Sequence, residues 1–100
     1  MKRIYISGPM SGIKDLNYPA FNAEAARLRG LGHHVENPAE NPEPPFGGWS
    51  AYMRMAIKQL MECDTIYLLP GYTMSKGAML EVYIGLSMGM NFMGEDHEPA

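Results

Sequence analysis

Residues 64–89 read DTIYLLPGYTMSKGAMLEVYIGLSMG, and this stretch changes character half-way along. Its first part, Thr65–Leu69, is an apolar run too short for a helix and rich in strand-forming residues, which predicts a buried strand. Pro70 and Gly71 end that strand. From about Ser75 the pattern is helical, so the stretch predicts a strand, a short polar loop and a helix.

One carboxylate, Glu81, stands in this otherwise apolar helix. A buried acid is costly unless it is paired or used. At about 100° per residue, Gly77, Ala78 and Gly85 share its face, so the surface beside the carboxylate is small and hollow. Two interpretations remain open. The hollow admits a ligand, or the small residues only let two backbones approach while Glu81 bonds to a neighbouring loop.

The alternation of strand and helix extends outward from this stretch. The pattern predicts a strand at residues 2–7, a helix from residue 18, a short strand at 33–36 and a helix at about 49–62. Residues 37–48, NPAENPEPPFGG, hold four prolines and are predicted to form an irregular loop, either functional or a solvated connector. The order β-α-β-α-β-α predicts an α/β fold, a small doubly wound, Rossmann- or flavodoxin-like three-layer sandwich with a parallel sheet of three to four strands.

Composition narrows the classes of function. The 100 residues suit one domain, expected at residues 1–93, with a frayed acidic tail at 94–100. The net charge of −3 argues against a nucleic-acid polymer as partner. We expect a cytoplasmic protein without a signal peptide, a membrane partner or a disulfide, since Cys63 is alone. His33 and His34 would face opposite sides of a strand, so no metal site and no cofactor are expected.

Ligands of doubly wound sheets bind beyond the carboxyl ends of the strands. Three loops should meet there, at residues 8–17, 37–48 and 70–75. The helix that begins near Ser75 would direct its N-terminus at the same crevice and offer free N–H groups to an anion. Ser75, Lys76 and Gly77 are therefore a candidate phosphate seat.

With these pieces placed, the sequence resembles the nucleoside 2'-deoxyribosyltransferase superfamily, particularly its small nucleotide N-glycosidase branch and short phage-type members. Tyr5, three residues before Gly8, matches the family's Tyr-x-x-Gly, and the segment from Ser75 to Glu81 matches its Ser-x-Gly-x-x-x-Glu. Further matches to the phage-type members are Asn17-x-Pro19-x-Phe21, Asn37-Pro38 and Leu69-Pro70-Gly71. Together these motifs cover about residues 3–90.

The resemblance implies a mechanism. Glu81 would attack C1' of a deoxyribose, with Tyr5 as its catalytic companion, and water or a second base would resolve the glycosyl-enzyme. The implied substrate-binding residues are Gly8, Pro9, Met10, Ser11, Pro70, Gly71, Ser75, Lys76 and Gly77. Ser75 stands where the transferases of free nucleosides carry an aspartate, which favours a nucleoside 5'-monophosphate. Burial would raise the pKa of Glu81 and the helix N-terminus would lower it, and the sequence does not decide between them.

Two departures from the family pattern qualify this mechanism. Ala56 occupies the place of the second acid that helps the base leave, and Asp15, Glu40 or Glu43 are possible substitutes, whereas Asp64 lies at the wrong end of its strand. The first loop reads Gly8-Pro9-Met10-Ser11, without the arginine of the monophosphate hydrolases. A non-catalytic nucleotide-binding or sequestering protein is therefore the main alternative. A phosphoribohydrolase of the cytokinin-activating type is a third, more distant one.

The last helix also predicts self-association. Apolar residues surround it on all sides, and a sheet of three or four strands cannot cover them all. We expect a homodimer or higher homo-oligomer through this helix, with a nucleotide or nucleoside as the small-molecule partner.

Overall fold

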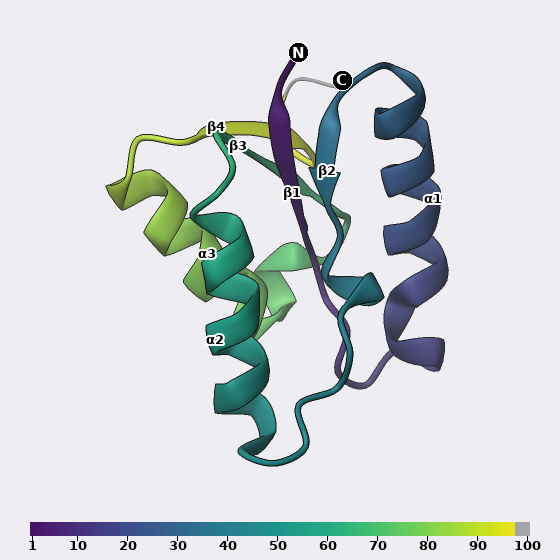
Figure 1. Ribbon diagram of the computed structural model, residues 1–100, viewed down its shortest axis with the longest axis vertical. Helices are drawn as coiled ribbons and strands as arrows, with labels where there is room; N and C mark the ends of the chain where they lie inside the picture. The colour runs from purple at the N-terminus through teal and green to yellow at the C-terminus, as the bar shows by residue number, and fades with distance from the viewer. Residues whose placement is uncertain (98–100) are drawn as a thin grey trace.

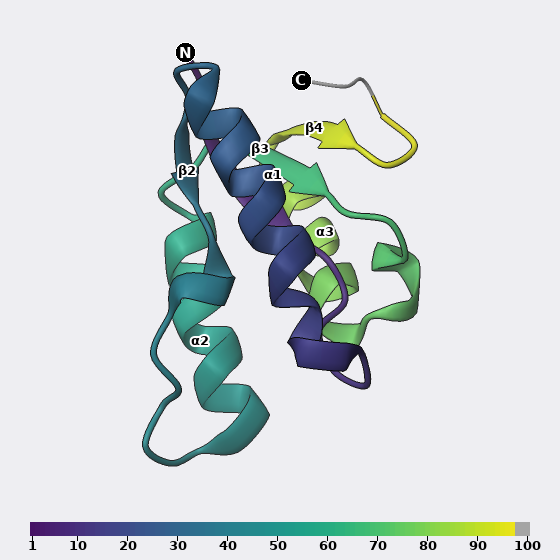
Figure 2. The same cartoon turned by 90° about the vertical axis from the view of Figure 1, so that its right-hand side faces the viewer.

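The computed structural model describes residues 1–97. Four parallel strands form a sheet in the order β2-β1-β3-β4, with β1 at Arg3–Ser7, β2 at His34–Glu36, β3 at Thr65–Leu68 and β4 at Asn91–Gly94. Helix α1 (Tyr18–Gly30) covers one face, and α2 (Gly48–Leu60) and α3 (Lys76–Ser87) cover the other (Figures 1 and 2). The predicted three-layer, flavodoxin-like α/β fold is confirmed.

Alternation of side chains along β1 builds the two halves of the core. Ile4 and Ile6 point toward α1 and pack with Phe21 and Leu28, all of them buried. Tyr5, between them, faces α2 and lies in the other cluster. Since successive side chains of a strand point to opposite faces, a single five-residue strand supplies both cores.

The edge strand β4 was not among the predicted elements. Its sequence, NFMG, is short, and it gains its structure by pairing with β3 from Thr65↔Asn91 to Leu68↔Gly94. Gly94, which opens the predicted tail, therefore ends a strand, and the N–H of Glu95 donates to the carbonyl of Leu68 at 2.8 Å. Of the predicted tail at 94–100, residues 98–100 lie outside the described part of the chain.

Part of the proline-rich loop is regular, which corrects the prediction for residues 37–48. Pro38–Glu40 form a 3-10 turn, because Asn37 accepts a hydrogen bond from the N–H of Ala39 at 3.1 Å and proline fits the first position of a helical turn. Helix α2 begins at Gly48, one residue earlier than predicted. The irregular segment is therefore limited to residues 41–47.

The strand order places the site. The chain leaves β1 for β2 on one side and later adds β3 on the other, so the order reverses between β1 and β3. Ligands of such sheets bind beyond the carboxyl ends of the strands at this reversal, which here means just after Ser7 and Leu68. Within residues 1–97, no helix has the length and hydropathy needed to cross a bilayer.

Candidate active site

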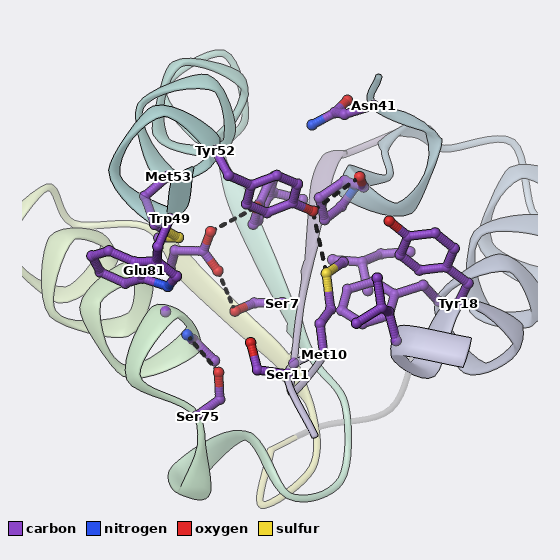
Figure 3. A pocket seen from close by; sticks show the side chains of 18 of the residues that line it. Ser7, Met10, Ser11, Tyr18, Asn41, Trp49, Tyr52, Met53, Ser75 and Glu81 are labelled. Carbon is purple, nitrogen blue, oxygen red and sulfur yellow. Dashed lines mark hydrogen bonds between the residues drawn. The ribbon is translucent and has the colours of Figure 1, made fainter. Parts of the chain in front are cut away.

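A cavity of about 410 Å³ opens at the carboxyl end of β1. Its walls come from the end of β1 and the loop after it, the start of α1, the loop before α2, the first turns of α2 and the first turn of α3. Figure 3 shows the side chains that line it. Segments that are far apart in sequence thus meet at the predicted end of the sheet.

Glu81 of α3 reaches the inner end of this cavity and is held at both carboxyl oxygens. The phenol of Tyr5 donates to Oε2 at 2.6 Å, and the hydroxyl of Ser7 donates to Oε1 at 2.7 Å. Tyr5 and Ser7 are two residues apart on β1, so they project from the same face of the sheet toward α3. Glu81 is only 5% exposed, yet both of its oxygens have a partner (Figure 3).

The electrostatics of this carboxyl group follow from its burial. Desolvation raises the pKa of Glu81 to about 7, although the hydrogen bonds from Tyr5 and Ser7 act in the opposite direction. Burial and the nearby charge of Glu81 raise the pKa of Tyr5 well above 10, so its phenol stays protonated and remains a donor. Near neutral pH both the protonated and the ionised form of Glu81 are therefore populated, whereas the Tyr5 phenol keeps its proton.

Aromatic rings and thioethers form much of the remaining wall. Trp49, Tyr52 and Met53 come from the first turns of α2, and Tyr18 comes from the start of α1 (Figure 3). The hydroxyl of Tyr52 donates to the carbonyl of Pro38 at 3.2 Å, which fixes its ring in place. Flat apolar faces with few polar atoms suit a planar heterocycle.

The N-terminus of α3 borders the cavity beside Glu81. Ser75 caps the helix by accepting from the N–H of Ala78 at 3.1 Å, and its carbonyl accepts from Met79. The N–H groups of Lys76 and Gly77 then have no acceptor within the helix. A Cβ at Gly77 would lie 3.1 Å from Sδ of Met53, so glycine lets α3 approach α2 closely here. Ser75 and Gly77 line the cavity and present a helix N-terminus to it.

The loop between β1 and α1 forms the outer wall with Met10 and Ser11. Asp15, Leu16 and Asn17 all have positive φ, between 52° and 61°, a conformation that costs each non-glycine residue about 1–2 kcal/mol. The side-chain amide of Asn17 donates to the carbonyl of Pro9 at 2.9 Å and closes the loop.

The structure brings most of the predicted site residues together. Those that line the cavity are Tyr5, Gly8, Met10, Ser11, Ser75, Gly77 and Glu81. Pro9, Pro70, Gly71 and Lys76 are not part of its wall. Lys76 instead places its ammonium group 4.2 Å from the ring centroid of Trp49, and Pro70 borders a separate hollow near β4.

The small residues of α3 were expected either to form a ligand-binding hollow or to let two backbones approach, and the structure shows both. Gly77 and Ala78 border the cavity, as a ligand-binding hollow requires. Gly85 does not, because a Cβ there would lie 2.5 Å from Cδ1 of Ile66 and 3.1 Å from Cζ of Phe92. Gly85 therefore serves the close approach of α3 to the sheet.

The structure also distinguishes among the acids considered as substitutes for the missing second acid. Glu43 lines the cavity, whereas Glu40 is bound to Arg29 at 2.7 Å and Asp15 does not reach the wall. Asp64 accepts from the N–H of Arg3 at 3.2 Å, at the amino end of the sheet.

Several residues of the wall were not predicted: Ser7, Tyr18, Asn41, Trp49, Tyr52 and Met53. Ser7 carried a usable signal, since a residue two positions after Tyr5 on a strand shares its face. The residues on α2 carried none, because their position depends on how α2 docks on the sheet.

A family model described as a domain of unknown function, DUF4406, matches residues 2–93. The chain belongs to this family. A comparison with curated proteins gave no match. The DUF4406 chain is similar in structure to the 2-deoxyribosyltransferase of Bacillus psychrosaccharolyticus, with a TM-score of 0.71 and 23% identity over 92% of this chain and 70% of that one.

Two further solved structures are similar to this DUF4406 protein. The 2-desoxiribosyltransferase of Leishmania mexicana has a TM-score of 0.71 and 20% identity, over 94% of this chain and 63% of that one. A conserved protein of Enterococcus faecalis V583 has a TM-score of 0.69 and 21% identity, over 94% and 62%. The chain thus spans less than two thirds of these two proteins. The resemblance to the deoxyribosyltransferase superfamily is confirmed as a likeness of fold.

Proposed function

We propose that this DUF4406 protein cleaves the N-glycosidic bond of a nucleoside 5'-monophosphate, or transfers its deoxyribosyl group, with Glu81 as the nucleophile. The observation that carries the proposal is a buried carboxyl group, Glu81, with a pKa of about 7, held by Tyr5 and Ser7 at the inner end of a cavity. Structural neighbours described as deoxyribosyltransferases support it.

The chemistry proposed for Glu81 is a double displacement. A carboxylate oxygen forms a bond to C1' of the sugar as the bond from C1' to the base nitrogen breaks, and the electron pair leaves with the base. Water or a second base then attacks C1' as the bond from C1' to Glu81 breaks, its electron pair returns to the carboxylate, and the proton of the attacking group passes to the expelled base. Tyr5 and Ser7 orient the carboxylate for both steps by holding its two oxygens.

The phosphate is proposed to bind at the N-terminus of α3. The hydroxyl of Ser75 and the N–H groups of Lys76 and Gly77 lie beside the cavity, and the helix dipole favours an anion there. Lys76 would add a positive charge by swinging from the face of Trp49, a contact worth about 0.5–1 kcal/mol when exposed.

A neutral nucleoside is the second candidate substrate, and one observation favours it. Among the described residues that line the cavity there is no lysine, arginine or histidine, while Glu43 and Glu81 are both acids. A phosphate would therefore enter a site whose fixed side-chain charges are negative unless Lys76 moves. Comparing each nucleoside with its 5'-monophosphate separates the two substrates.

The test is release of free base. The protein is incubated with deoxynucleosides and ribonucleosides and with their 5'-monophosphates, with and without a second base as acceptor, and the products are separated by chromatography. We expect release by the wild type and its loss in Glu81→Gln. The matched control is Glu62→Gln, which makes the same change at an exposed residue that is not part of the cavity wall.

A nucleotide that raises the melting temperature but is never cleaved would replace the proposal with the non-catalytic, nucleotide-binding alternative. Absence of both binding and cleavage would remove both proposals.

We further propose a homodimer or higher homo-oligomer through α3. Met79, Tyr83 and Leu86 follow one side of this helix at intervals of four and three residues and are 41%, 69% and 67% exposed. Tyr83→Glu would place a charge in the middle of this stripe, and light scattering should then report a smaller particle than for the wild type. A monomeric wild type at micromolar concentration contradicts the proposal.

A further inference from the structure

The described cavity wall contains two carboxyl groups, on different elements. Glu81 belongs to α3, and Glu43 belongs to the loop that joins the 3-10 turn at Pro38–Glu40 to α2. Glu81 is buried and hydrogen bonded at both oxygens, whereas Glu43 is exposed. Glycoside chemistry typically uses a pair of carboxyl groups, one as nucleophile and one as acid and base.

The backbone at Glu43 is stiff although it lies in a loop. The sequence from residue 42 is Pro-Glu-Pro-Pro, so Glu43 follows one proline and precedes another. A residue before proline is restricted to extended conformations, and each proline has its own φ fixed. The side chain of Glu43 is therefore directed by a backbone with little freedom.

The start of this loop is also tied down. Asn41 and Gln59 exchange hydrogen bonds through their side-chain amides, at 2.6 and 2.9 Å, and Gln59 also donates to Glu36 at 3.1 Å. Asn41 lies on the far side of Tyr52 from Glu81 in the view of Figure 3. A base expelled from C1' moves away from the attacking carboxylate, and this loop borders the same cavity.

Three other acidic groups near the cavity are engaged. The proton of Tyr5 is donated to Glu81, and burial raises the pKa of the Tyr52 phenol to about 12 while its hydroxyl donates to Pro38. Glu40 is bound to Arg29 at 2.7 and 2.9 Å. Ala56, fully buried, has no proton to give.

We propose that Glu43 is the acid and base of this site, a role that rests on the proposed function. In the first step the carboxylic acid of Glu43 gives its proton to a ring nitrogen of the base as the C1'–N bond breaks and Glu81 bonds to C1'. In the second step the Glu43 carboxylate takes a proton from water as the water oxygen bonds to C1' and the bond to Glu81 breaks. Hydrolysis then consumes one water and returns both carboxyl groups to their starting states.

The test depends on the leaving group. A 7-methylguanine base already carries a positive charge and leaves without a proton from the enzyme, whereas guanine needs one. The substrates are deoxyguanosine and 7-methyldeoxyguanosine, both as nucleosides and as 5'-monophosphates. We expect Glu43→Gln to lower kcat/KM, which reports the departure of the base, about 10²- to 10⁴-fold for the guanine substrate and to change kcat/KM for the methylated one by less than about tenfold.

Controls separate this role from others. Glu43→Asp keeps a carboxyl group and should retain part of the activity lost in Glu43→Gln, and Glu62→Gln should behave as the wild type. An equal loss of kcat/KM on both substrates, no loss on either, or the same selectivity in Tyr18→Phe overturns the role of Glu43 and leaves the proposed function standing. Failure of the wild type to cleave either substrate overturns the proposed function and this inference together.

Discussion

Replacing Glu81 with glutamine should stabilise the protein, and increasingly so as the pH rises. Burial raises the pKa of Glu81 from its ordinary 4.5 to about 7. A carboxyl group with a raised pKa holds its proton more tightly in the folded than in the unfolded chain, so the folded state loses stability as the pH rises from about 4.5 to about 7. Each pKa unit is worth about 1.4 kcal/mol, which makes the full loss about 3 kcal/mol.

The glutamine side chain carries no charge at any pH and avoids this loss. Urea unfolding at a series of pH values measures the difference in the free energy of unfolding between Glu81→Gln and the wild type. We expect a difference near zero at about pH 4, where Glu81 is protonated in both states, and a gain approaching about 3 kcal/mol above about pH 8. In Glu62→Gln, where the side chain is exposed, the difference should stay small throughout. A difference for Glu81→Gln that is flat with pH, or that shrinks as the pH rises, would refute the reasoning.

The other predictions concern the partners of Glu81 and the edge of the sheet. Ser7→Ala removes a hydrogen bond that favours the carboxylate, so the pKa of Glu81, followed by NMR titration, should rise by about one unit. An unchanged titration would mean that Ser7 does not tune the group. Gly94→Ala should cost about 2 kcal/mol or more in urea unfolding, because φ there is +92° and a Cβ would contact the backbone of Leu68. Gly89→Ala, at φ +72° with open space around it, should cost about 1 kcal/mol, and equal costs at the two glycines would contradict the steric argument.

The alternation of strands and helices was predictable because the apolar residues of each main element follow the spacing typical of a strand or of a helix. Residues 65–69 show the unbroken apolar run of a buried parallel strand, and Phe21, Ala25 and Leu28 show the spacing of a helix that covers a sheet. Strand β4 was not predicted, because its four residues include a terminal glycine and are held by pairing with β3. Tertiary pairing of this kind leaves little signal in the local sequence.

The inner end of the site and the loop after β1 were predictable, whereas the wall that α1 and α2 supply was not. Glu81 is an acid in an otherwise apolar helix, and Tyr5 lies three residues before Gly8, as in the family motif. Both residues therefore stand out in the sequence alone. Which atoms meet Glu81 depends on the packing of α3 against β1, which the sequence does not give. Lys76 shows how far the sequence alone can mislead. It was predicted to help bind a phosphate, but in the structure its ammonium group lies over the ring of Trp49.

The balance between burial and hydrogen bonding at Glu81 was also beyond the sequence. From the sequence, burial was expected to raise the pKa of Glu81 and the helix N-terminus to lower it, and their relative size depends on how completely the side chain is enclosed. At 5% exposure burial dominates, and the hydrogen bonds from Tyr5 and Ser7 reduce the rise without cancelling it. The lowering effect comes from these two hydroxyls on β1.

Mass spectrometry of the protein quenched during incubation with deoxynucleosides and their 5'-monophosphates tests the central claim most directly. A covalent glycosyl intermediate should add the mass of one sugar, or sugar phosphate, to the chain, and fragmentation should place it on Glu81, with no adduct in Glu81→Gln. Release of free base at the same rate by the wild type and by Glu81→Gln, with no adduct on Glu81, would contradict the account.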